Sequence, residues 1–416
     1  MNHWKVQNPR QDLSYEIAFT QAYRAALKRY THPAEIELAM LRAQYPAIMH
    51  PIEDNDVLAG RVEFGLVGYG IQGQTGGTGY YIDEPRVVQA LEFAEGNAKY
   101  REDLHDMLTF WKARNTYNKV LRETPAELRA AIPTEQWKTE PVAASPIIRM
   151  AGAYIDFDKL VRVGVPGLRA ELTALLDTAP AAGRDEVLLR CALGALDVLC
   201  GMLRFYETQA REKAADAPTP ARRKEMEDLA AALHELPERA PTSLLAAMQL
   251  CWLYGVMCPL VEFGRMDEYL GDLYCHDIDN GVITEAQALK MAQTYFYLID
   301  ALDDETDGRV IVGGYGRRNP ENADRYCLVA CEACRTVKEI LPQFTLRFNK
   351  ETPKAVWDAA MRCIGEGRTF PLLYNDEVLV PGVMKAFGVD RARAETYMPL
   401  GCGEIEFDHY SFGSPN

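Results

Sequence analysis

From residue 309 onward the sequence alternates between short strand-like runs and helix-like segments, and this order restricts the fold more than any other feature of the chain. The strand-like runs are rich in β-branched and aromatic residues, whereas the other segments carry apolar residues at helical spacing. The expected strands cover residues 309–315, 343–348 and 371–374, and the expected helices cover residues 322–340, 354–365, 377–387 and 390–396. Strands that alternate with helices form parallel sheets through crossover connections. The sequence therefore predicts an α/β fold, with functional groups on loops at the carboxyl ends of the strands.

Upstream of this region the chain is expected to be mainly helical. Pro33 stands in the first turn of one expected helix, and the run from Thr284 to Gln287 is typical of a capped helix start. The expected helices cover residues 14–30, 33–48, 158–176, 185–209, 222–234, 243–257 and 284–301, and residues 86–122 are expected to form a long helix or a helix pair. The proline-containing residues 123–148 are expected to form a connector, and residues 210–220 a polar loop.

The last stretch of the chain holds the strongest candidate for chemistry. Cys402 stands between Gly401 and Gly403, and Glu404 follows. Because glycine accepts positive φ angles, this run is expected to form a tight loop tip with Cys402 at its apex. A neighbouring carboxylate disfavours the thiolate, so Cys402 is a poor nucleophile; a neutral thiol beside a carboxylate instead suits transfer of a hydrogen atom coupled to transfer of a proton. The same residues also fit an ordinary structural turn.

A glycine-rich segment offers a competing cofactor interpretation. Gly68, Gly70 and Gly73 match the G-x-G-x-x-G pattern of dinucleotide-binding folds. That pattern requires a helix directly after the glycines, because the phosphates bind at its N-terminus. The residues that follow are more glycines, threonines and tyrosines, which break helices. We therefore expect a structural loop here.

Three cysteines offer a second competing interpretation. Cys327, Cys331 and Cys334 match the C-x-x-x-C-x-x-C spacing of radical S-adenosylmethionine enzymes, which bind an iron–sulfur cluster. Here the three cysteines fall on one face of an expected helix, spread over about 10 Å at 1.5 Å per residue. Short side chains spread along a helix do not converge on one cluster, so these thiols are expected to pack in the core.

Arg265 and Asp267 follow Gly264, and such a pair is most often a structural ion pair at a loop. A direct catalytic role for them is the less favoured alternative.

The bulk composition excludes several partners. The net charge of −15 argues against nucleic acid or an anionic membrane as a partner. No apolar run is long enough to span a bilayer, and the ten cysteines lie scattered in helix-like segments. These features, with no secretory signal, predict a reduced cytoplasmic protein with free thiols.

Taken together, the motifs resemble the N-terminal half of glycyl radical enzymes, the superfamily of pyruvate formate-lyase and of radical lyases and dehydratases. The resemblance runs through almost the whole chain. It rests on residues 56–60, 222–223, 237–249, 264–269, 277–284, 313–314, 341–344, 371–376 and 397–404. This set is far more specific than any single motif.

The resemblance implies a ten-stranded α/β barrel made of two five-stranded halves, with the Cys loop in its centre. This chain would be one pyruvate formate-lyase-like domain over residues 1–416. Residues 1–148 would form a mainly helical N-terminal region, and residues 149–416 would form the first half of the barrel, ending in the Cys loop.

The resemblance also implies a mechanism and partners. A radical S-adenosylmethionine activase installs a radical on a backbone glycine, and Cys402 would become a thiyl radical that takes a hydrogen atom from a small substrate. Glu404 would transfer a proton as the leaving group departs. Pyruvate formate-lyase uses two adjacent cysteines, whereas Gly403 follows Cys402 here. The lyase and dehydratase branch is therefore favoured over a formate-lyase-like acyltransferase. No bound metal or cofactor is expected, and a complete enzyme is expected to form a homodimer.

Some positions depart from the family pattern. The residue fourteen positions after the Cys is an Asp that holds substrate hydroxyls in diol dehydratases, and here it is Asn416, a neutral amide. A family His is replaced near residues 152–154, and a polar pair before Gly264 is replaced by Pro259 and Leu260. We therefore expect a less polar pocket and a substrate other than a simple vicinal diol, with Asn416 among the substrate-binding residues.

The family's Arg-Val-x-Gly-Tyr radical loop is not found in this chain. The run from Arg309 to Tyr315 echoes it, but carries one residue too many and lies upstream of the Cys. A partner polypeptide with the radical glycine is therefore expected, because a half barrel would expose a strand edge. Two alternatives stay open: a non-catalytic fragment or scaffold of the same fold, and an iron–sulfur protein.

Overall fold

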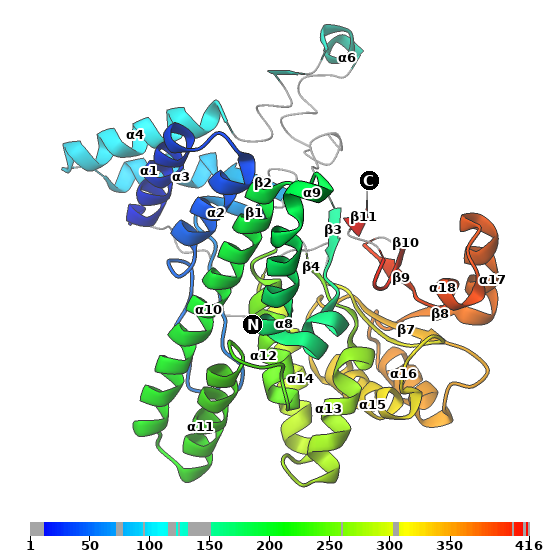
Figure 1. The fold of residues 1–416 in the computed structure, drawn as a ribbon. Helices are drawn as coiled ribbons and strands as arrows, with labels where there is room; N and C mark the ends of the chain where they lie inside the picture. The colour runs from blue at the N-terminus through cyan, green and yellow to red at the C-terminus, as the bar shows by residue number, and fades with distance from the viewer. Residues whose placement is uncertain are drawn as a thin grey trace.

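The computed structural model describes residues 12–71, 78–94, 96–114, 122–123, 125–131, 151–258, 261–302, 308–401, 403–410 and 413–414 (Figure 1). Helices predominate before residue 260. They are α1 (Ser14–Arg29), α2 (Pro33–Gln44), α3 (Glu84–Phe93), α4 (Ala98–Lys112), α6 (Ala126–Ala131), α8 (Phe157–Asp177), α9 (Ala179–Ala182), α10 (Glu186–Ala215), α11 (Pro220–Glu235) and α12 (Leu244–Gly255). The later helices are α13 (Met266–Asp279), α14 (Glu285–Ala301), α15 (Pro320–Thr336), α16 (Lys354–Gly365), α17 (Asp376–Phe387) and α18 (Arg391–Ala394).

The strands form four small sheets. Two of the sheets are the antiparallel hairpins β1 (Val67–Ile71) with β2 (Thr78–Ile82), and β9 (Tyr397–Leu400) with β10 (Glu404–Phe407). A third sheet has the order β11 (Gly413–Ser414), β3 (Ala151–Tyr154), β4 (Val261–Glu262). The fourth has the order β5 (Gly264–Arg265), β6 (Val310–Gly313), β7 (Phe344–Phe348), β8 (Leu372–Asn375), and all its neighbours are parallel.

The parallel order of β6, β7 and β8, with α15 and α16 as crossovers, confirms the α/β fold class. In Figure 1 the β9–β10 hairpin lies close to the sheet strands rather than on the helical side of the molecule. The ten-stranded barrel stays a prediction.

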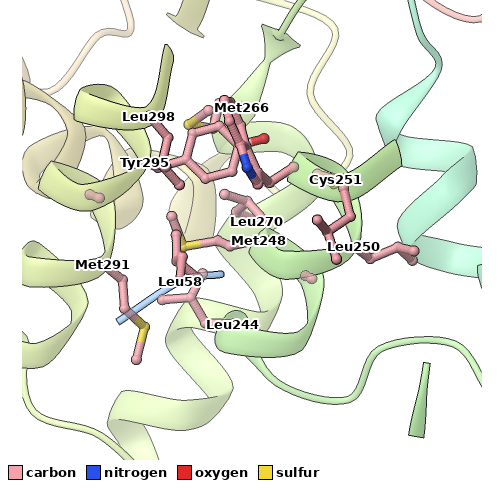
Figure 2. Close-up of a cluster of buried hydrophobic side chains, with 14 of the residues drawn as sticks. Leu58, Leu244, Met248, Leu250, Cys251, Met266, Leu270, Met291, Tyr295 and Leu298 are labelled. Atoms are coloured by element: carbon pink, nitrogen blue, oxygen red, sulfur yellow. The ribbon is translucent and has the colours of Figure 1, made fainter. Parts of the chain in front are cut away.

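The main core lies around α12, whose residues from Leu244 to Leu253 are almost all buried. Figure 2 shows side chains of α12, α13 and α14 meeting there, among them Met248, Met266 and Tyr295. A second apolar cluster is built from buried residues between Leu13 and Trp111. The assignment of residues 1–148 to a separate region stays a prediction.

Local capping explains where several helices begin. Thr284 and Gln287 form a capping box at the start of α14, and Pro33 lies at the start of α2, as predicted from the sequence. Gly68 and Gly70 of the glycine pattern lie in β1 of the β1–β2 hairpin, and the next described residues form strand β2; Gly73 lies outside the described residues.

Two predicted elements were wrong. The loop expected over residues 210–220 is too long, because α10 continues to Ala215 and buries Ala210 and Ala214 in the main core. The stretch after Arg265 was predicted as a loop but starts α13, a helix with buried residues from Met266 to Asp277. The described part of the chain has no helix with the length and apolar character needed to cross a bilayer.

Candidate functional site

The predicted loop tip is the turn of the β9–β10 hairpin. Leu400 pairs with Glu404, and the Gly403 N–H donates to the Leu400 carbonyl at 2.7 Å. Gly401 and Gly403 have φ angles of +47° and +110°, as the sequence predicted for the glycines that flank Cys402. Cys402 itself, like Asn416, lies outside the described residues.

Neither glycine of the turn has room for a side chain. A Cβ atom on Gly401 would lie 2.9 Å from Glu404 Oε2, and one on Gly403 would lie 2.9 Å from the Tyr374 hydroxyl. Both distances are shorter than a Cβ atom tolerates without movement of its neighbour, and positive φ angles add strain for any other residue. The positive φ angles and the close neighbours therefore favour glycine on both sides of Cys402.

Glu404 is the first residue of β10 and carries an unsatisfied acceptor. Its Oε2 atom is buried and has no hydrogen-bond partner among the residues that the structure describes. Buried carboxylate oxygens are normally hydrogen-bonded, so an exception calls for an explanation. The free oxygen faces the turn, since it lies next to Gly401.

Glu262 and Arg309 hold the peptide groups of Gly401. The Gly401 N–H donates to Glu262 Oε1 at 2.6 Å, and the Arg309 guanidinium donates to the Gly401 carbonyl. The Arg309 backbone N–H donates to Glu262 Oε2, so the Glu262 carboxylate contacts both the Gly401 peptide and the Arg309 backbone. Sequence reasoning missed both as site residues. One feature of the sequence could have pointed to them, since each is a charged residue beside apolar residues. Val261 and Phe263 flank Glu262, and the apolar residues 310–312 follow Arg309.

A buried ion pair fixes the start of β9. Arg347 on β7 and Asp376 at the start of α17 are both fully buried, and Arg347 Nη2 lies 2.8 Å from Asp376 Oδ2. Arg347 also donates to the Tyr397 carbonyl at 2.6 Å and to the Glu395 carbonyl at 3.0 Å. The Tyr397 hydroxyl donates to Asp376 Oδ1 at 2.7 Å. The strand before the turn is therefore tied to the parallel sheet.

Arg265 and Asp267 do not form an ion pair with each other in the structure, which corrects the pairing expected from the sequence. Asp267 pairs with Arg317 at 3.1 Å and accepts the Gly313 N–H at 2.8 Å. Arg265 donates to the Tyr315 carbonyl at 2.8 Å. Both residues thus support the turn after β6, and neither contacts a described residue of the Cys tip.

The end of β10 carries a cluster of titratable side chains. His409 Nδ1 lies 3.1 Å from Asp156 Oδ2 and 3.7 Å from Asp408 Oδ1. The Tyr154 hydroxyl donates to Asp408. Burial raises the pKa of Asp408, and the hydrogen bond to Asp156 raises the pKa of His409. This cluster ties β10 to α8, whose N-cap is Asp156.

The cysteine triplet lies within α15 and not on a cluster-binding loop. Cys327, Cys331 and Cys334 are at most 3% exposed and belong to the main core. Burial raises the pKa of Cys327 and Cys331, and the protonated thiol is a poor metal ligand. The geometry supports core packing, as predicted.

Comparison with known proteins places this geometry in a family. The family model described as pyruvate formate lyase-like matches residues 25–410. The (2S)-3-sulfopropanediol dehydratase of Klebsiella oxytoca is 21% identical over 353 residues, which cover 77% of this chain and 42% of that protein. The isethionate sulfite-lyase of Nitratidesulfovibrio vulgaris is 24% identical over 405 residues, which cover 87% of this chain and 48% of that protein. The chain thus spans less than half the length of these relatives.

Solved structures show the same fold. The glycerol-bound B12-independent glycerol dehydratase of Clostridium butyricum matches with a TM-score of 0.72 at 17% identity, over 94% of this chain and 52% of that one. Hydroxyproline dehydratase of Clostridioides difficile matches with a TM-score of 0.73 at 17% identity, over 95% of this chain and 53% of that one. The resemblance inferred from the motifs is confirmed, and the chain belongs to the pyruvate formate lyase-like family of glycyl radical enzymes.

Proposed function

We propose that this chain provides the thiol–carboxylate half of a glycyl radical enzyme of the lyase or dehydratase type. Cys402 would remove a hydrogen atom from a small organic substrate, and Glu404 would transfer a proton while a carbon–heteroatom bond breaks. Glu404 is the first residue of β10, and Cys402 precedes it by two positions in the sequence.

The observation that carries the proposal is the free oxygen of Glu404. Its Oε2 atom is buried beside Gly401 and has no hydrogen-bond partner in the described chain. A buried acceptor of this kind is available to a donor on a bound substrate, which is the first requirement of a general base. Only Gly403 separates this carboxylate from Cys402.

The chemistry follows from these two groups. A glycyl radical, when present, supplies the unpaired electron, and the residues of this chain do the rest. Cys402 lacking its hydrogen atom takes one from a substrate carbon, so that an S–H bond forms as a C–H bond breaks. Glu404 takes the proton of a hydroxyl group on that carbon and passes a proton to the leaving group on the adjacent carbon, which departs with the electrons of its bond to carbon. A carbonyl group forms, and the unpaired electron moves to the adjacent carbon. The product carbon finally takes the hydrogen atom back from Cys402.

The substrate is expected to be small and polar. The relatives are named for 3-sulfopropanediol, isethionate and trans-4-hydroxy-L-proline, and they are dehydratases or sulfite-lyases. We propose a hydroxylated or sulfonated substrate other than a simple vicinal diol, with the Asn416 amide among its contacts. Because Gly403 and not a second cysteine follows Cys402, acyl transfer as in pyruvate formate-lyase is the less favoured function.

The proposal includes partners. We expect a radical S-adenosylmethionine activase and a polypeptide segment that carries the radical glycine, together with assembly of the complete enzyme as a cytoplasmic homodimer. This chain covers 42% and 48% of the length of the two relatives compared above.

The test is an anaerobic activation assay. The chain is combined with a polypeptide bearing the radical glycine, the activase and S-adenosylmethionine, and product formation from hydroxylated and sulfonated small molecules is measured beside electron paramagnetic resonance. We expect a glycyl doublet and turnover. Cys402→Ala and Glu404→Gln should keep the doublet and lose turnover at least 100-fold.

The matched control is Cys191→Ala, which removes a thiol from α10 and should leave turnover unchanged. A doublet with full turnover in Cys402→Ala would refute the proposed role of the thiol. A doublet without turnover of any substrate in the wild type would favour the scaffold alternative.

A further inference from the structure

The residue before Cys402 is held at both of its peptide groups by side chains distant in sequence. The Gly401 N–H donates to Glu262 Oε1 at 2.6 Å, and the Gly401 carbonyl accepts from Arg309. Backbone groups at a hairpin turn are ordinarily satisfied by the hairpin itself or by water. Here two charged side chains replace both, which fixes the position and the tilt of the peptide that leads into the tip.

The two side chains are themselves fixed. Glu262 is fully buried, and Arg309 is 2% exposed. Arg309 donates to Thr345 Oγ1 at 2.8 Å and to Gln343 Oε1 at 2.6 Å, so its guanidinium is oriented by the start of β7. Its backbone N–H reaches Glu262 Oε2, which orients the carboxylate. The arrangement joins strands β4, β6 and β7 to the turn.

Buried charge of this kind is an expensive way to stabilise a fold. Removing a charged side chain from water costs free energy that well-packed apolar residues avoid. The advantage of buried charge is a defined geometry, since charge-assisted hydrogen bonds are short and directional. Reacting groups need to be held within about 0.5 Å, and that precision comes from the residues behind them.

We infer that Glu262 and Arg309 are positioning residues that hold the Gly401 peptide, so that the Cys402 thiol and the Glu404 carboxylate meet the same substrate. The effect of these residues on turnover rests on the proposed function. The hydrogen bonds that hold the Gly401 peptide do not depend on it, because they lie within this chain. Neither side chain needs to touch substrate.

The first experiment measures the contact without any radical chemistry. Hydrogen–deuterium exchange of the Gly401 amide is followed by mass spectrometry with fragmentation to single residues, in the wild type, Glu262→Gln and Arg309→Lys. Gln offers one acceptor oxygen where Glu offers two, so it cannot accept from both Gly401 and Arg309. We expect Gly401 exchange to rise at least tenfold in Glu262→Gln, and to rise to a smaller extent in Arg309→Lys.

The matched control is Asp277→Asn. Asp277 is a buried carboxylate, 2% exposed, and its Oδ2 atom accepts the Leu244 N–H at 2.8 Å within the main core. This variant should lower the melting temperature as Glu262→Gln does and leave Gly401 exchange as in the wild type. Equal Gly401 exchange in Glu262→Gln and in the control, compared at matched stability, would overturn the inference.

The second experiment separates the inference from the proposed function. In the activated complex, turnover per glycyl radical spin should fall at least tenfold in Glu262→Gln, with KM changed less than threefold, because substrate contacts are retained. A wild type without turnover, together with the expected change in Gly401 exchange, would refute the proposed function and leave the holding contact standing. Full turnover per spin in a variant with raised exchange would refute the positioning role.

Discussion

The Arg347–Asp376 pair allows a sharp test of what fixes the β9–β10 hairpin. Arg347→Met keeps an unbranched apolar stem and removes the guanidinium with its four donated hydrogen bonds. Two of these go to Asp376, at 3.1 Å and 2.8 Å, one to the Tyr397 carbonyl at 2.6 Å and one to the Glu395 carbonyl at 3.0 Å. Asp376 is then left as a buried carboxylate without its cation.

The expected cost is about 4 kcal/mol of unfolding free energy. Removal of one partner from a buried ion pair costs about 3–5 kcal/mol, because a charge is left uncompensated. Asp376 still accepts hydrogen bonds from the Tyr397 hydroxyl at 2.7 Å and from the Tyr315 N–H at 2.7 Å. These two bonds partly stabilise the unpaired carboxylate, so the loss should be less than about 5 kcal/mol. The Tyr397 and Glu395 carbonyls each lose a charged donor, so the loss should exceed about 3 kcal/mol.

The assay is urea unfolding followed by circular dichroism, on Arg347→Met, on Asp376→Asn and on the double variant. Because the two residues act as one unit, the double variant should lose about 2 kcal/mol less than the sum of the single losses. A loss below about 1 kcal/mol in Arg347→Met, or additive losses in the double variant, would show that the pair does not hold the start of β9.

Three further outcomes are expected. Gly401→Ala should lose about 1–2 kcal/mol of unfolding free energy, because alanine is strained at a φ of +47° and its Cβ would meet Glu404, whereas Gly365→Ala, with open space at its Cβ, should not be destabilised. His409→Gln should lower the melting temperature at pH 6 and leave it unchanged at pH 9. The pKa of His409 is raised chiefly by its hydrogen bond to Asp156, so that stabilisation is present below about pH 6.5 and is lost as pH rises through the raised pKa. As this pair is partly exposed, the effect is about 0.5 kcal/mol. Cys331→Ser should cost about 1–3 kcal/mol by burying a hydroxyl, and metal analysis of anaerobically purified wild type should find no stoichiometric iron; stoichiometric iron lost in this variant would contradict core packing.

Much of the α/β part of the fold could be predicted from local sequence. The strand runs near residues 310 and 344 are apolar and end in turns, and the helices between them show a clear apolar face, so both the alternation and the parallel order followed. The capping box at Thr284 placed the start of α14 correctly. In each case the signal lies within a few residues and competes with no tertiary effect.

Tertiary contacts decided the elements that sequence reasoning missed. The apolar residues at the end of α10 are all alanines in a charged stretch, and packing of Ala210 and Ala214 in the core keeps it helical. Its apolar signal was too weak to outweigh the charged residues around it. The start of α13 could not be predicted from the sequence, because its first residues form no apolar face toward a single neighbour. Asp267, for example, accepts a hydrogen bond from Gly313 at the end of β6.

In the candidate site, too, local features could be predicted from the sequence and long-range contacts could not. Glycines on both sides of Cys402 predicted the turn and its positive φ angles, because that requirement is local. Glu262 and Arg309 lie 139 and 92 positions from Gly401, and no local pattern connects residues that far apart. Only the fold brings them to the turn.

The central claim is that Cys402 and Glu404 form one reacting pair on a hairpin that needs a glycyl radical from another segment. The most direct measurement is turnover per glycyl spin in the activated complex for the wild type, Cys402→Ala and Glu404→Gln, with the doublet recorded for each. We predict an equal doublet in all three and turnover in the wild type alone. Turnover that survives in either variant with an undiminished doublet would contradict the claim.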